Sequence, residues 1–403
     1  SKEPSMQISE RLRSIKPSLT LSVNSRALEL KAQGVDVTSL AVGEPDFPTP
    51  RHICDAAKAA IDANFCRYTA VPGIPDLRKA AGRYFERNYG TPVPMESIII
   101  GAGGKHCLYN FMQATINPGD EVLIPAPYWL SYPDMVELAG GVPVTVHAGP
   151  ERNFKVTPLM LEEKTTDKTR LLVLNSPSNP TGAVYSDREF MQIMRWALAR
   201  NIFVLSDEIY DQLVFPPAKM TSAITWFEHC PELVAVLNGL SKSYAMTGWR
   251  IGYSAAPRDI ARGINALQGH VTSNSTTFVQ WAAIEALEQG EKDVKSMVAE
   301  FVQRRDYTYD RISKIPNVTC SKPGGAFYLL PDVSWYYGKK AGNQVIHDSF
   351  ELSEYLLQQY HVAVVPGGAF MAPNAIRIAY TNSLGEISRG MDRIESALAA
   401  LEK

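Results

Sequence analysis

Residues 202–210 read IFVLSDEIY, a short apolar run that ends in the polar residues Ser206, Asp207 and Glu208. An apolar run of this length without strict alternation is typical of a strand that is buried on both faces. Turn residues and helical stretches separate similar runs, which stand at residues 98–100, 122–124, 142–146, 171–174 and 233–237. This alternation of strands and helices predicts an α/β fold with a mostly parallel sheet between helices.

The pattern is different towards the two ends of the chain. Residues 26–33 and 52–63 have the apolar spacing of helices. Beyond about residue 285, long helical stretches (291–314, 347–360, 385–402) alternate with short strand candidates (326–330, 362–365, 375–379). We predict a smaller α+β domain built from both ends: residues 1–50 form an N-terminal arm and part of the small domain, 51–285 the large domain, and 286–403 the rest of the small domain.

Composition narrows the classes of function. A chain of 403 residues with 45% hydrophobic and 20% charged residues is long enough for two globular domains and is not typical of a disordered protein. Lys and Arg number 40 against 42 Asp and Glu, so no net basic charge indicates a nucleic-acid partner. No apolar run approaches the length of a membrane-spanning helix, and the N-terminus lacks the apolar segment of a secretory signal.

The five cysteines are scattered, and no CxxC pair occurs among them. This pattern favours free thiols in a reducing compartment over a disulfide framework or a zinc site. We therefore expect a cytoplasmic enzyme without a metal or a membrane partner.

In open α/β sheets, ligands bind beyond the carboxyl ends of the strands. After the first strand stands Gly101-Ala102-Gly103-Gly104-Lys105, followed by a helical stretch. Glycines and a helix N-terminus suit a phosphate group. The loop matches neither the P-loop nor the dinucleotide fingerprint, so it is either a phosphate cradle or a tight turn.

The next strands end in residues that have two interpretations each. Trp129 is either a stacking partner for a planar ring or a packed core indole. Asn179, in the turn-rich NSPSNPTG of residues 175–182, either presents its amide to a ligand or makes an Asx turn. Asp207 either faces a protonated ring nitrogen, with the phenol of Tyr210 three residues on, or caps a helix.

Three cations complete the candidate site. Lys242 follows an apolar strand, where burial lowers the pKa of an amine and makes it nucleophilic towards carbonyl carbon. Arg250 is a phosphate fork or a structural arginine, and Arg377, inside IRIA, is a clamp for a substrate carboxylate or a surface arginine. Taken together, these groups match one ligand, pyridoxal 5′-phosphate (PLP).

The chain also resembles the fold-type I PLP-dependent aminotransferases of class I/II, and within them the bacterial aspartate and aspartate/prephenate aminotransferase branch. The resemblance runs through nearly the whole chain, and NPTG, SDEIY, and SK with GWRIGY are together its most specific motifs. It covers Lys16-Pro17-Ser18, AVGEPDFPTP (41–50), RYTAVPGIPDLR (67–78), GGK (103–105), PYWLSYP (127–133), NSPSNPTGAVY (175–185), SDEIY (206–210), SKSYAMTGWRIGY (241–253), PGGAFY (323–328) and IRIAY (376–380). It implies a large domain with a seven-stranded, mostly parallel sheet, a smaller domain, and a homodimer with shared active sites.

The resemblance also implies a role for each candidate residue. Lys242 matches the lysine that holds PLP as a Schiff base, and Asp207, Tyr210 and Trp129 match the residues at the ring nitrogen, at the ring hydroxyl and on the ring face. The remaining positions match groups that bind the phosphate or the substrate. At the phosphate they are the backbone amides of Gly104 and Lys105, the Arg250 side chain and, across the family's dimer, Tyr68 of the neighbouring subunit. Asn179 matches a group at both the ring hydroxyl and the substrate carboxylate, and Gly43 and Arg377 match groups at that carboxylate.

Two positions depart from the pattern of many relatives. Gly239 stands where many carry a phosphate-binding serine, and Ser241 is the candidate substitute. No counterpart of the arginine that reads the distal carboxylate in animal-type enzymes is evident. Lys16, in Lys16-Pro17-Ser18, matches the lysine associated with that carboxylate in the bacterial branch, and is otherwise a solvated lysine before a proline.

The activity implied is transfer of the amino group between L-aspartate or L-glutamate and 2-oxo acids such as 2-oxoglutarate and oxaloacetate, with prephenate as a further candidate, by a ping-pong mechanism. The alternatives within enzymes are an aminotransferase for aromatic or aliphatic amino acids and a PLP-dependent C–S lyase. A binding protein that has kept the fold without the activity is the alternative outside enzymes.

Overall fold

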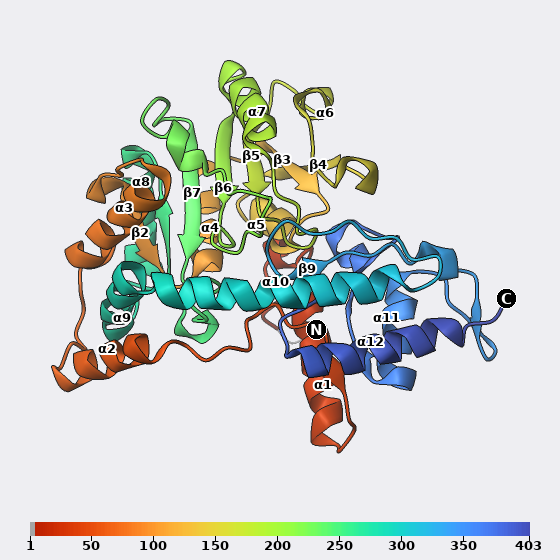
Figure 1. The fold of residues 1–403 in the computed structure, drawn as a ribbon. Coiled ribbons are helices and arrows are strands. Elements are labelled where there is room, and N and C mark those ends of the chain that lie inside the picture. Colours follow the sequence, from red (N-terminus) through yellow and green to blue (C-terminus); the bar gives the residue numbers. More distant parts are fainter. Residues whose placement is uncertain (1–4) are drawn as a thin grey trace.

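The computed structural model describes residues 5–403, and its largest sheet has seven strands in the order β2-β8-β7-β6-β5-β3-β4 (Figure 1). These strands are β2 (Ile98–Gly101), β3 (Glu121–Ala126), β4 (Val142–His147), β5 (Thr169–Asn175), β6 (Phe203–Asp207), β7 (Val234–Gly239) and β8 (Gly252–Ala255). β4, β3, β5, β6 and β7 are paired in parallel, and β8 is antiparallel to both β7 and β2. The prediction of a mostly parallel sheet is confirmed.

Helices cover both faces of this sheet because successive residues of its strands point to opposite cores. In β5, Leu171 and Val173 pack with α4 (Gly104–Thr115), α5 (Ser131–Leu138) and α8 (Arg258–Val271). Leu172 and Leu174 pack on the other face, in the core formed with α2 (Arg51–Asp62), α3 (Pro75–Tyr89), α6 (Pro158–Glu163), α7 (Asp187–Ala199) and α9 (Thr277–Gln289). Each fully buried leucine contributes about 1.5–3 kcal/mol of transfer free energy, so both faces stabilise the sheet.

Local signals in the sequence explain where several helices begin and end. Ser186 and Glu189 form a reciprocal capping box at the start of α7. Pro75 occupies the first turn of α3, and Gly90 ends that helix with a φ of 71°. The strand β8 does not stand out as an apolar run in the sequence, because Gly-Tyr-Ser-Ala has only one large apolar side chain.

A second body combines segments from both ends of the chain. The helices α1 (Leu19–Ala32), α11 (Ser349–Tyr360) and α12 (Leu384–Ala399) surround an antiparallel sheet of β13 (Val365–Pro366), β14 (Ile376–Ala379) and β9 (Tyr328–Leu329). β1 (Thr38–Ser39) pairs in parallel with β12 (Val362–Ala363), and β10 (Lys340–Ala341) forms a hairpin with β11 (Gln344–Val345). The predicted division at residues 50/51 and 285/286 stays a prediction.

The long helix α10 (Glu291–Ser313) extends from the helices that cover the large sheet to the second body (Figure 1). Val294, near its start, packs in the core of the large sheet, whereas Phe301 and Ile312 pack in the core of the second body. In the described part of the chain, residues 5–403, no helix combines the length and the apolar character needed to cross a membrane.

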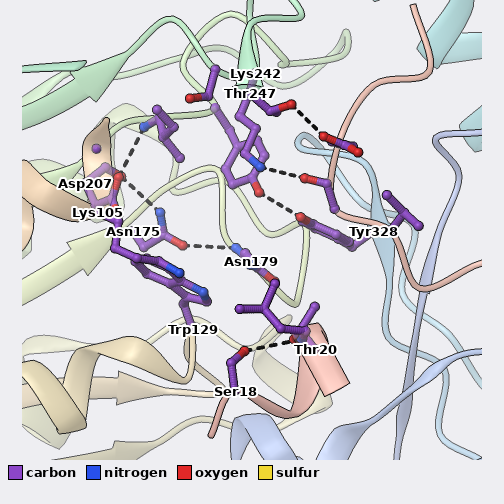
Figure 2. Close-up of a pocket in the computed structure, with 18 of the residues that line it drawn as sticks. Ser18, Thr20, Lys105, Trp129, Asn175, Asn179, Asp207, Lys242, Thr247 and Tyr328 are labelled. Carbon is purple, nitrogen blue, oxygen red and sulfur yellow. Dashed lines mark hydrogen bonds between the residues drawn. The ribbon is translucent and has the colours of Figure 1, made fainter. Parts of the chain in front are cut away.

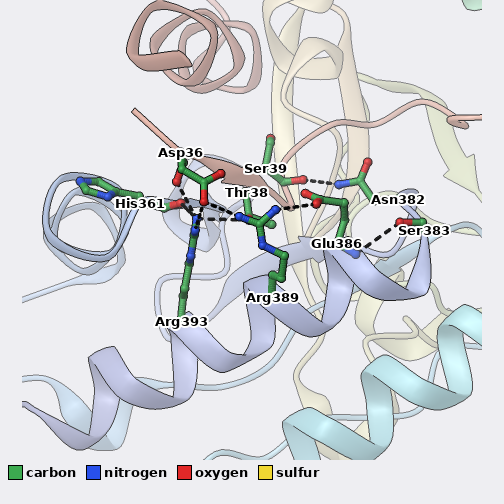
Figure 3. Close-up of polar contacts among 9 residues, drawn as sticks. All are labelled: Asp36, Thr38, Ser39, His361, Asn382, Ser383, Glu386, Arg389 and Arg393. Atoms are coloured by element: carbon green, nitrogen blue, oxygen red, sulfur yellow. Dashed lines mark hydrogen bonds and ion pairs between the residues drawn. The ribbon is translucent and has the colours of Figure 1, made fainter. Parts of the chain in front are cut away.

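An ionic cluster holds the N-terminal segment on the second body (Figure 3). The Asp36 carboxylate, just before β1, pairs with the guanidinium groups of Arg389 and Arg393 on α12. Arg393 also donates to the carbonyl oxygens of Asp36 and His361, each over 2.8 Å. Because these bonds surround the β1–β12 pairing, the segment that continues from β1 starts from a defined position.

Candidate active site

A cavity of about 390 Å³ lies beyond the carboxyl ends of β5, β6 and β7, where the second body meets the sheet (Figure 2). This is the place at which open α/β sheets bind ligands. The structure brings most of the sequence-predicted residues together in its lining: Gly43, Gly104, Lys105, Trp129, Asn179, Asp207, Tyr210, Ser241, Lys242, Arg250 and Arg377. Lys16 and Tyr68 are not among the residues that line it.

Lys242 projects into this cavity from the loop beyond β7. Its Nζ atom donates to the carbonyl oxygen of Gly43 over 2.5 Å, and lies 5.9 Å from the centre of the Tyr210 ring. Burial lowers the pKa of Lys242 to about 8, although the negative charge of Glu44 acts in the opposite direction. An amine with this pKa has a far larger unprotonated, nucleophilic fraction near neutral pH than an ordinary lysine.

Asp207 ends β6 and faces the cavity as a buried acid. Its Oδ2 atom accepts a hydrogen bond from the Tyr132 hydroxyl over 2.6 Å, and its Oδ1 atom accepts from the backbone N–H of Ile209 over 3.3 Å. Burial raises the pKa of Asp207, while these two bonds and the charge of Lys242 lower it. No cationic side chain pairs with Asp207 in residues 5–403, so a positively charged ligand atom would complete its surroundings.

Tyr210, three residues beyond Asp207, is held by a second tyrosine. Its hydroxyl lies 2.8 Å from that of Tyr328, and the two rings pack edge to face. Burial raises the pKa of Tyr210 well above its ordinary value, so the phenol stays protonated near neutral pH. It is therefore available as a hydrogen-bond donor at the cavity wall.

Arg377 lies in β14 and carries its charge into the cavity almost completely buried. Its Nη1 atom donates to Oδ1 of Asn179 and its Nη2 atom donates to the carbonyl oxygen of Ala41, each over 2.9 Å. Both acceptors are neutral, and the Nε atom has no hydrogen-bond partner. A buried guanidinium without a carboxylate is costly, which indicates that an anionic ligand binds there.

The start of α4 forms an anion cradle with a third cation. Gly103, with a φ of 97°, precedes the free backbone N–H groups of Gly104 and Lys105. A Cβ atom on Gly103 would lie only 2.5 Å from Nη2 of Arg250, so the arginine packs directly on this glycine. Ser241 lines the same cavity. Backbone donors, a helix N-terminus and a guanidinium suit a phosphate group.

Trp129 and Lys105 form one wall of the cavity (Figure 2). The Nζ atom of Lys105 lies 5.2 Å from the centre of the indole ring, and the indole packs edge to face against Tyr132. Burial and the charge of Arg250 lower the pKa of Lys105. The resemblance implies only a backbone role for Lys105 at the phosphate, whereas its side chain also lines the cavity.

Lys16 and Tyr68 differ from the other candidates in their position. Lys16 is exposed, and its charge acts on Asp134 of α5. Tyr68 is 90% exposed within the single chain, so it contacts no group of its own cavity. The match that places Tyr68 at a phosphate therefore requires a second subunit.

Sequence reasoning missed three residues that hold the site together. Tyr132 binds Asp207, Tyr328 binds Tyr210, and Asn175 donates to the Asp207 carbonyl oxygen while accepting from the Asn179 N–H. One signal was available for Asn175, because it ends β5 directly beside Asp207 in the parallel sheet. Tyr328 ends the PGGAFY segment and Tyr132 stands three residues after Trp129, but no spacing rule assigns either tyrosine a partner.

Comparison with known proteins agrees with this geometry. The family model described as aminotransferase class I and II matches residues 35–394. The chain belongs to this family. The aminotransferase is 44% identical to the aspartate aminotransferase of Bacillus sp. over 96% of its own chain and 98% of that relative. It is 43% identical to the aspartate/prephenate aminotransferase of Cereibacter sphaeroides over 98% of its chain and 99% of that protein.

Solved structures of the family have the same fold as this aminotransferase. The aspartate aminotransferase of Rhizobium meliloti superposes with a TM-score of 0.95 at 35% identity, over 99% of this chain and 100% of that one. The Thermus thermophilus aspartate aminotransferase with maleate superposes with a TM-score of 0.91 at 37% identity, over 98% and 100% of the two chains. The prediction of a transaminase with this α/β fold is confirmed.

Proposed function

We propose that this aminotransferase binds PLP in the cavity and transfers the amino group between L-aspartate or L-glutamate and a 2-oxo acid such as 2-oxoglutarate or oxaloacetate. The observation that carries the proposal is the convergence of Lys242, Asp207 and Arg377 on one cavity beyond the sheet. These three residues supply a nucleophilic amine, a buried acid and an unpaired buried cation. PLP, when bound, supplies an electron-accepting ring that is conjugated to the substrate amine.

The donor set of the cavity fits PLP group by group. The N-terminus of α4, Ser241 and Arg250 would hold the phosphate, and Trp129 would stack on the ring. Asp207 would face the ring nitrogen, and the Tyr210 phenol and Asn179 amide would bind the ring hydroxyl. The close packing of Gly103 on Arg250 supports the fit, since a side chain at residue 103 would fill the cradle.

The residues of this chain then have distinct tasks in the reaction. Lys242 attaches the cofactor covalently, and its released amine moves the proton from the substrate Cα, first as a base and then as an acid. Its pKa of about 8 suits both tasks near neutral pH. Arg377 and Asn179 bind the substrate carboxylate, which orients the Cα–H bond for removal of this proton. Asp207, kept ionised, stabilises positive charge at the ring nitrogen.

A dicarboxylic substrate needs a second cation to bind its distal carboxylate. Among the cations that line the cavity, Lys105 is the one without another assigned role. Lys242, Arg250 and Arg377 are assigned to the cofactor and to the α-carboxylate. The Lys105 amine lies over the Trp129 ring on the side where Ser18 and Thr20 also line the cavity (Figure 2). We assign the distal carboxylate to this group, and Lys16 stays a second candidate. The names of the relatives support aspartate, and prephenate as a further acceptor.

We also propose that the enzyme is a homodimer with shared active sites. Tyr68 is 90% exposed, and the nearby apolar side chain of Phe65 is exposed as well. The Tyr68 segment is held by α9, because the Thr277 hydroxyl donates to the Arg67 carbonyl and the Trp281 ring stacks on Phe65. A rigid, exposed aromatic segment suits a subunit interface. The cytoplasmic location stays a prediction.

The test is an absorbance spectrum of the protein reconstituted with PLP, recorded before and after addition of L-aspartate. We expect a visible band that L-aspartate and L-glutamate convert to the shorter-wavelength band of the aminated cofactor, and that a 2-oxo acid restores. Lys242→Ala should abolish turnover and any covalent attachment. A preference for aromatic or aliphatic amino acids, or release of pyruvate and ammonia from a β-substituted substrate, would favour the alternative activities. A visible band that ignores every amino acid would refute the proposed function.

A further inference from the structure

The hydroxyl of Tyr132 provides the shorter of the two hydrogen bonds to the Asp207 carboxylate. Tyr132 Oη donates to Oδ2 of Asp207 over 2.6 Å, whereas Oδ1 accepts a bond of 3.3 Å from the Ile209 N–H. The two side chains are buried, Tyr132 being 2% and Asp207 8% exposed. Bulk water therefore cannot replace the hydroxyl, and a short bond from a neutral donor to a carboxylate is a strong one in such surroundings.

Packing holds the Tyr132 ring in one orientation. The residue lies on α5 and belongs to the core that covers one face of the sheet. Its ring meets the Trp129 indole edge to face, with centroids 5.3 Å apart and an interplanar angle of 88°. Because the ring is already ordered, the hydroxyl reaches Asp207 without a further loss of side-chain entropy.

Apart from Tyr132, few groups near Asp207 stabilise the negative charge of its carboxylate. Burial raises the pKa of its carboxyl, and the bond from Tyr132 is the largest of the effects that lower it. The other titratable neighbours are Cys107 on α4, Tyr210 beyond β6 and Lys242 beyond β7. Burial raises the pKa of Cys107 to about 12 and that of Tyr210 well above its ordinary value, so both are neutral from roughly pH 6 to 9. Lys242 alone among these three titrates in that range.

We propose that Tyr132 is a positioning residue that keeps Asp207 ionised and aimed at the ring nitrogen of the cofactor. The proposal rests on the proposed function, because it requires PLP in the cavity with its ring nitrogen at Asp207. Without the hydroxyl, Asp207 becomes more basic, and the proton that it shares with the ring nitrogen moves towards the carboxylate. The ring then accepts electrons less readily, while Arg377 still binds the substrate carboxylate.

The test compares Tyr132→Phe with a matched loss of another tyrosine hydroxyl. Tyr132→Phe keeps the ring against Trp129. Tyr355→Phe is the control, because it removes a hydroxyl that donates to the Ala397 carbonyl in the second body over 2.8 Å. Both variants and the wild type are reconstituted with PLP, and the visible absorbance is titrated with pH in the absence of substrate.

We expect the absorbance midpoint of Tyr132→Phe to rise by about one pH unit, because the link between Lys242 and the cofactor holds its proton more tightly beside a less positive ring. The kcat for L-aspartate should fall about tenfold, and the KM should change by less than about twofold. Tyr355→Phe should match the wild type in all three quantities.

Two further probes separate a charge effect from a packing effect. PLP methylated at the ring nitrogen is cationic at every pH, so with this analogue the midpoints of Tyr132→Phe and the wild type should coincide. Incorporation of 3-fluorotyrosine at position 132 makes the hydroxyl a stronger donor and should shift the midpoint in the opposite direction to Tyr132→Phe. This second substitution also keeps the test valid if Tyr132→Phe does not fold.

The outcomes are distinguishable. Equal midpoints for wild type, Tyr132→Phe and the fluorinated protein with PLP would overturn the role of Tyr132 and leave the proposed function in place. A shift that the methylated cofactor does not remove would also overturn it, since a packing defect would then be the cause. A wild-type protein that gives no amino-acid-sensitive band with PLP would overturn both proposals.

Discussion

The Lys242 amine and the Gly43 carbonyl oxygen lie 2.5 Å apart, and this bond joins the loop beyond β7 to the N-terminal segment across the cavity. Gly43 also has no space for a side chain, because a Cβ atom would lie 2.7 Å from the Tyr328 hydroxyl. Thr247 reinforces the junction through a hydrogen bond to Glu44. The lysine is therefore positioned by the segment that also contributes Gly43 to the proposed carboxylate site.

Lys242 should make the protein without cofactor less stable at neutral pH than at alkaline pH. Its pKa of about 8 is lower than that of an unfolded lysine, about 10.4, so the unfolded chain binds more protons between these values and stability rises with pH through this window. Lys242→Met should stabilise the apoprotein by on the order of 3 kcal/mol at pH 7 and by less than about 1 kcal/mol at pH 10. Urea unfolding at the two pH values measures the difference, and equal gains would contradict the prediction.

Arg377→Ala should raise the KM for amino-acid and oxo-acid substrates alike, because both carry the α-carboxylate that the guanidinium binds. The loss of a buried, charge-assisted pair predicts a fall in kcat/KM of about 100-fold. Arg377→Lys should recover only part of this loss, since an ammonium group lacks the planar fork. Steady-state kinetics with both substrates provide the measurement, and an unchanged KM in Arg377→Ala would rule out the clamp.

Gly103→Ala should weaken cofactor binding by about tenfold or more, because the new methyl group would displace Arg250 from the phosphate cradle. Gly119→Ala is the matched control: Gly119 also has a positive φ, of 85°, but a Cβ atom there meets nothing within 4 Å. Both variants place an alanine at a positive φ, so both bear backbone strain, and only Gly103→Ala also crowds Arg250. Absorbance titration of the apoproteins with PLP gives the two dissociation constants, and equal affinities would contradict the assigned cradle.

His52 should stabilise the fold most at acidic pH. Its ring nitrogens face Asp293 on α10 over 2.6 Å and Glu285 on α9 over 2.9 Å, and these carboxylates raise its pKa. The stabilisation is complete below the unfolded pKa of about 6.5 and is lost as pH rises through the higher folded value. His52→Gln should therefore cost about 1 kcal/mol at pH 5.5 and less at pH 9.

The exposed His347, which pairs with Glu351 on the surface, offers the control for this experiment. His347→Gln should leave stability nearly unchanged at both pH values, because both side chains are well hydrated. Chemical denaturation of the two variants and the wild type gives the comparison. A cost of His52→Gln that does not depend on pH would show that the histidine acts by packing alone.

If active sites are shared, two inactive variants should restore each other. Lys242→Ala lacks the catalytic amine, and Tyr68→Ala lacks the phenol that is offered to the partner. Mixed dimers contain one site with both groups, so an equal mixture, after subunit exchange, should reach about a quarter of wild-type activity. Activity that stays at the sum of the two separate variants would refute a shared site.

The sequence predicted the sheet and the chemistry at its edge for a physical reason. Buried parallel strands are continuous apolar runs, and the residues that follow them must meet at one edge, so Asp207 and Lys242 were identifiable before the structure. The strand β8 could not be predicted in this way, because its residues are small and do not form an apolar run. The chain position of Lys105 predicted its backbone at a phosphate, but only the fold shows its side chain over Trp129.

Contacts between distant segments explain the rest of what the sequence could not predict. Tyr132 and Asp207 are 75 positions apart, and Tyr210 and Tyr328 are 118 positions apart. Neither pair follows from helical or strand periodicity, since both depend on how α5 and β9 dock against the end of β6. Lys16 illustrates the reverse case, because a matching motif did not place its side chain at the cavity.

The pairing of β1 with β12 has a consequence for biosynthesis. Thr38 lies beside Val362, so the N-terminal strand leaves the ribosome long before its partner exists. The large sheet, whose strands all lie between residues 98 and 255, is complete in sequence much earlier and has a core of its own. The wall with Gly43 and Arg377, the proposed carboxylate site, can therefore be completed only after the whole large sheet has been synthesised. A nascent chain at this stage has Lys242 in place and no complete substrate site.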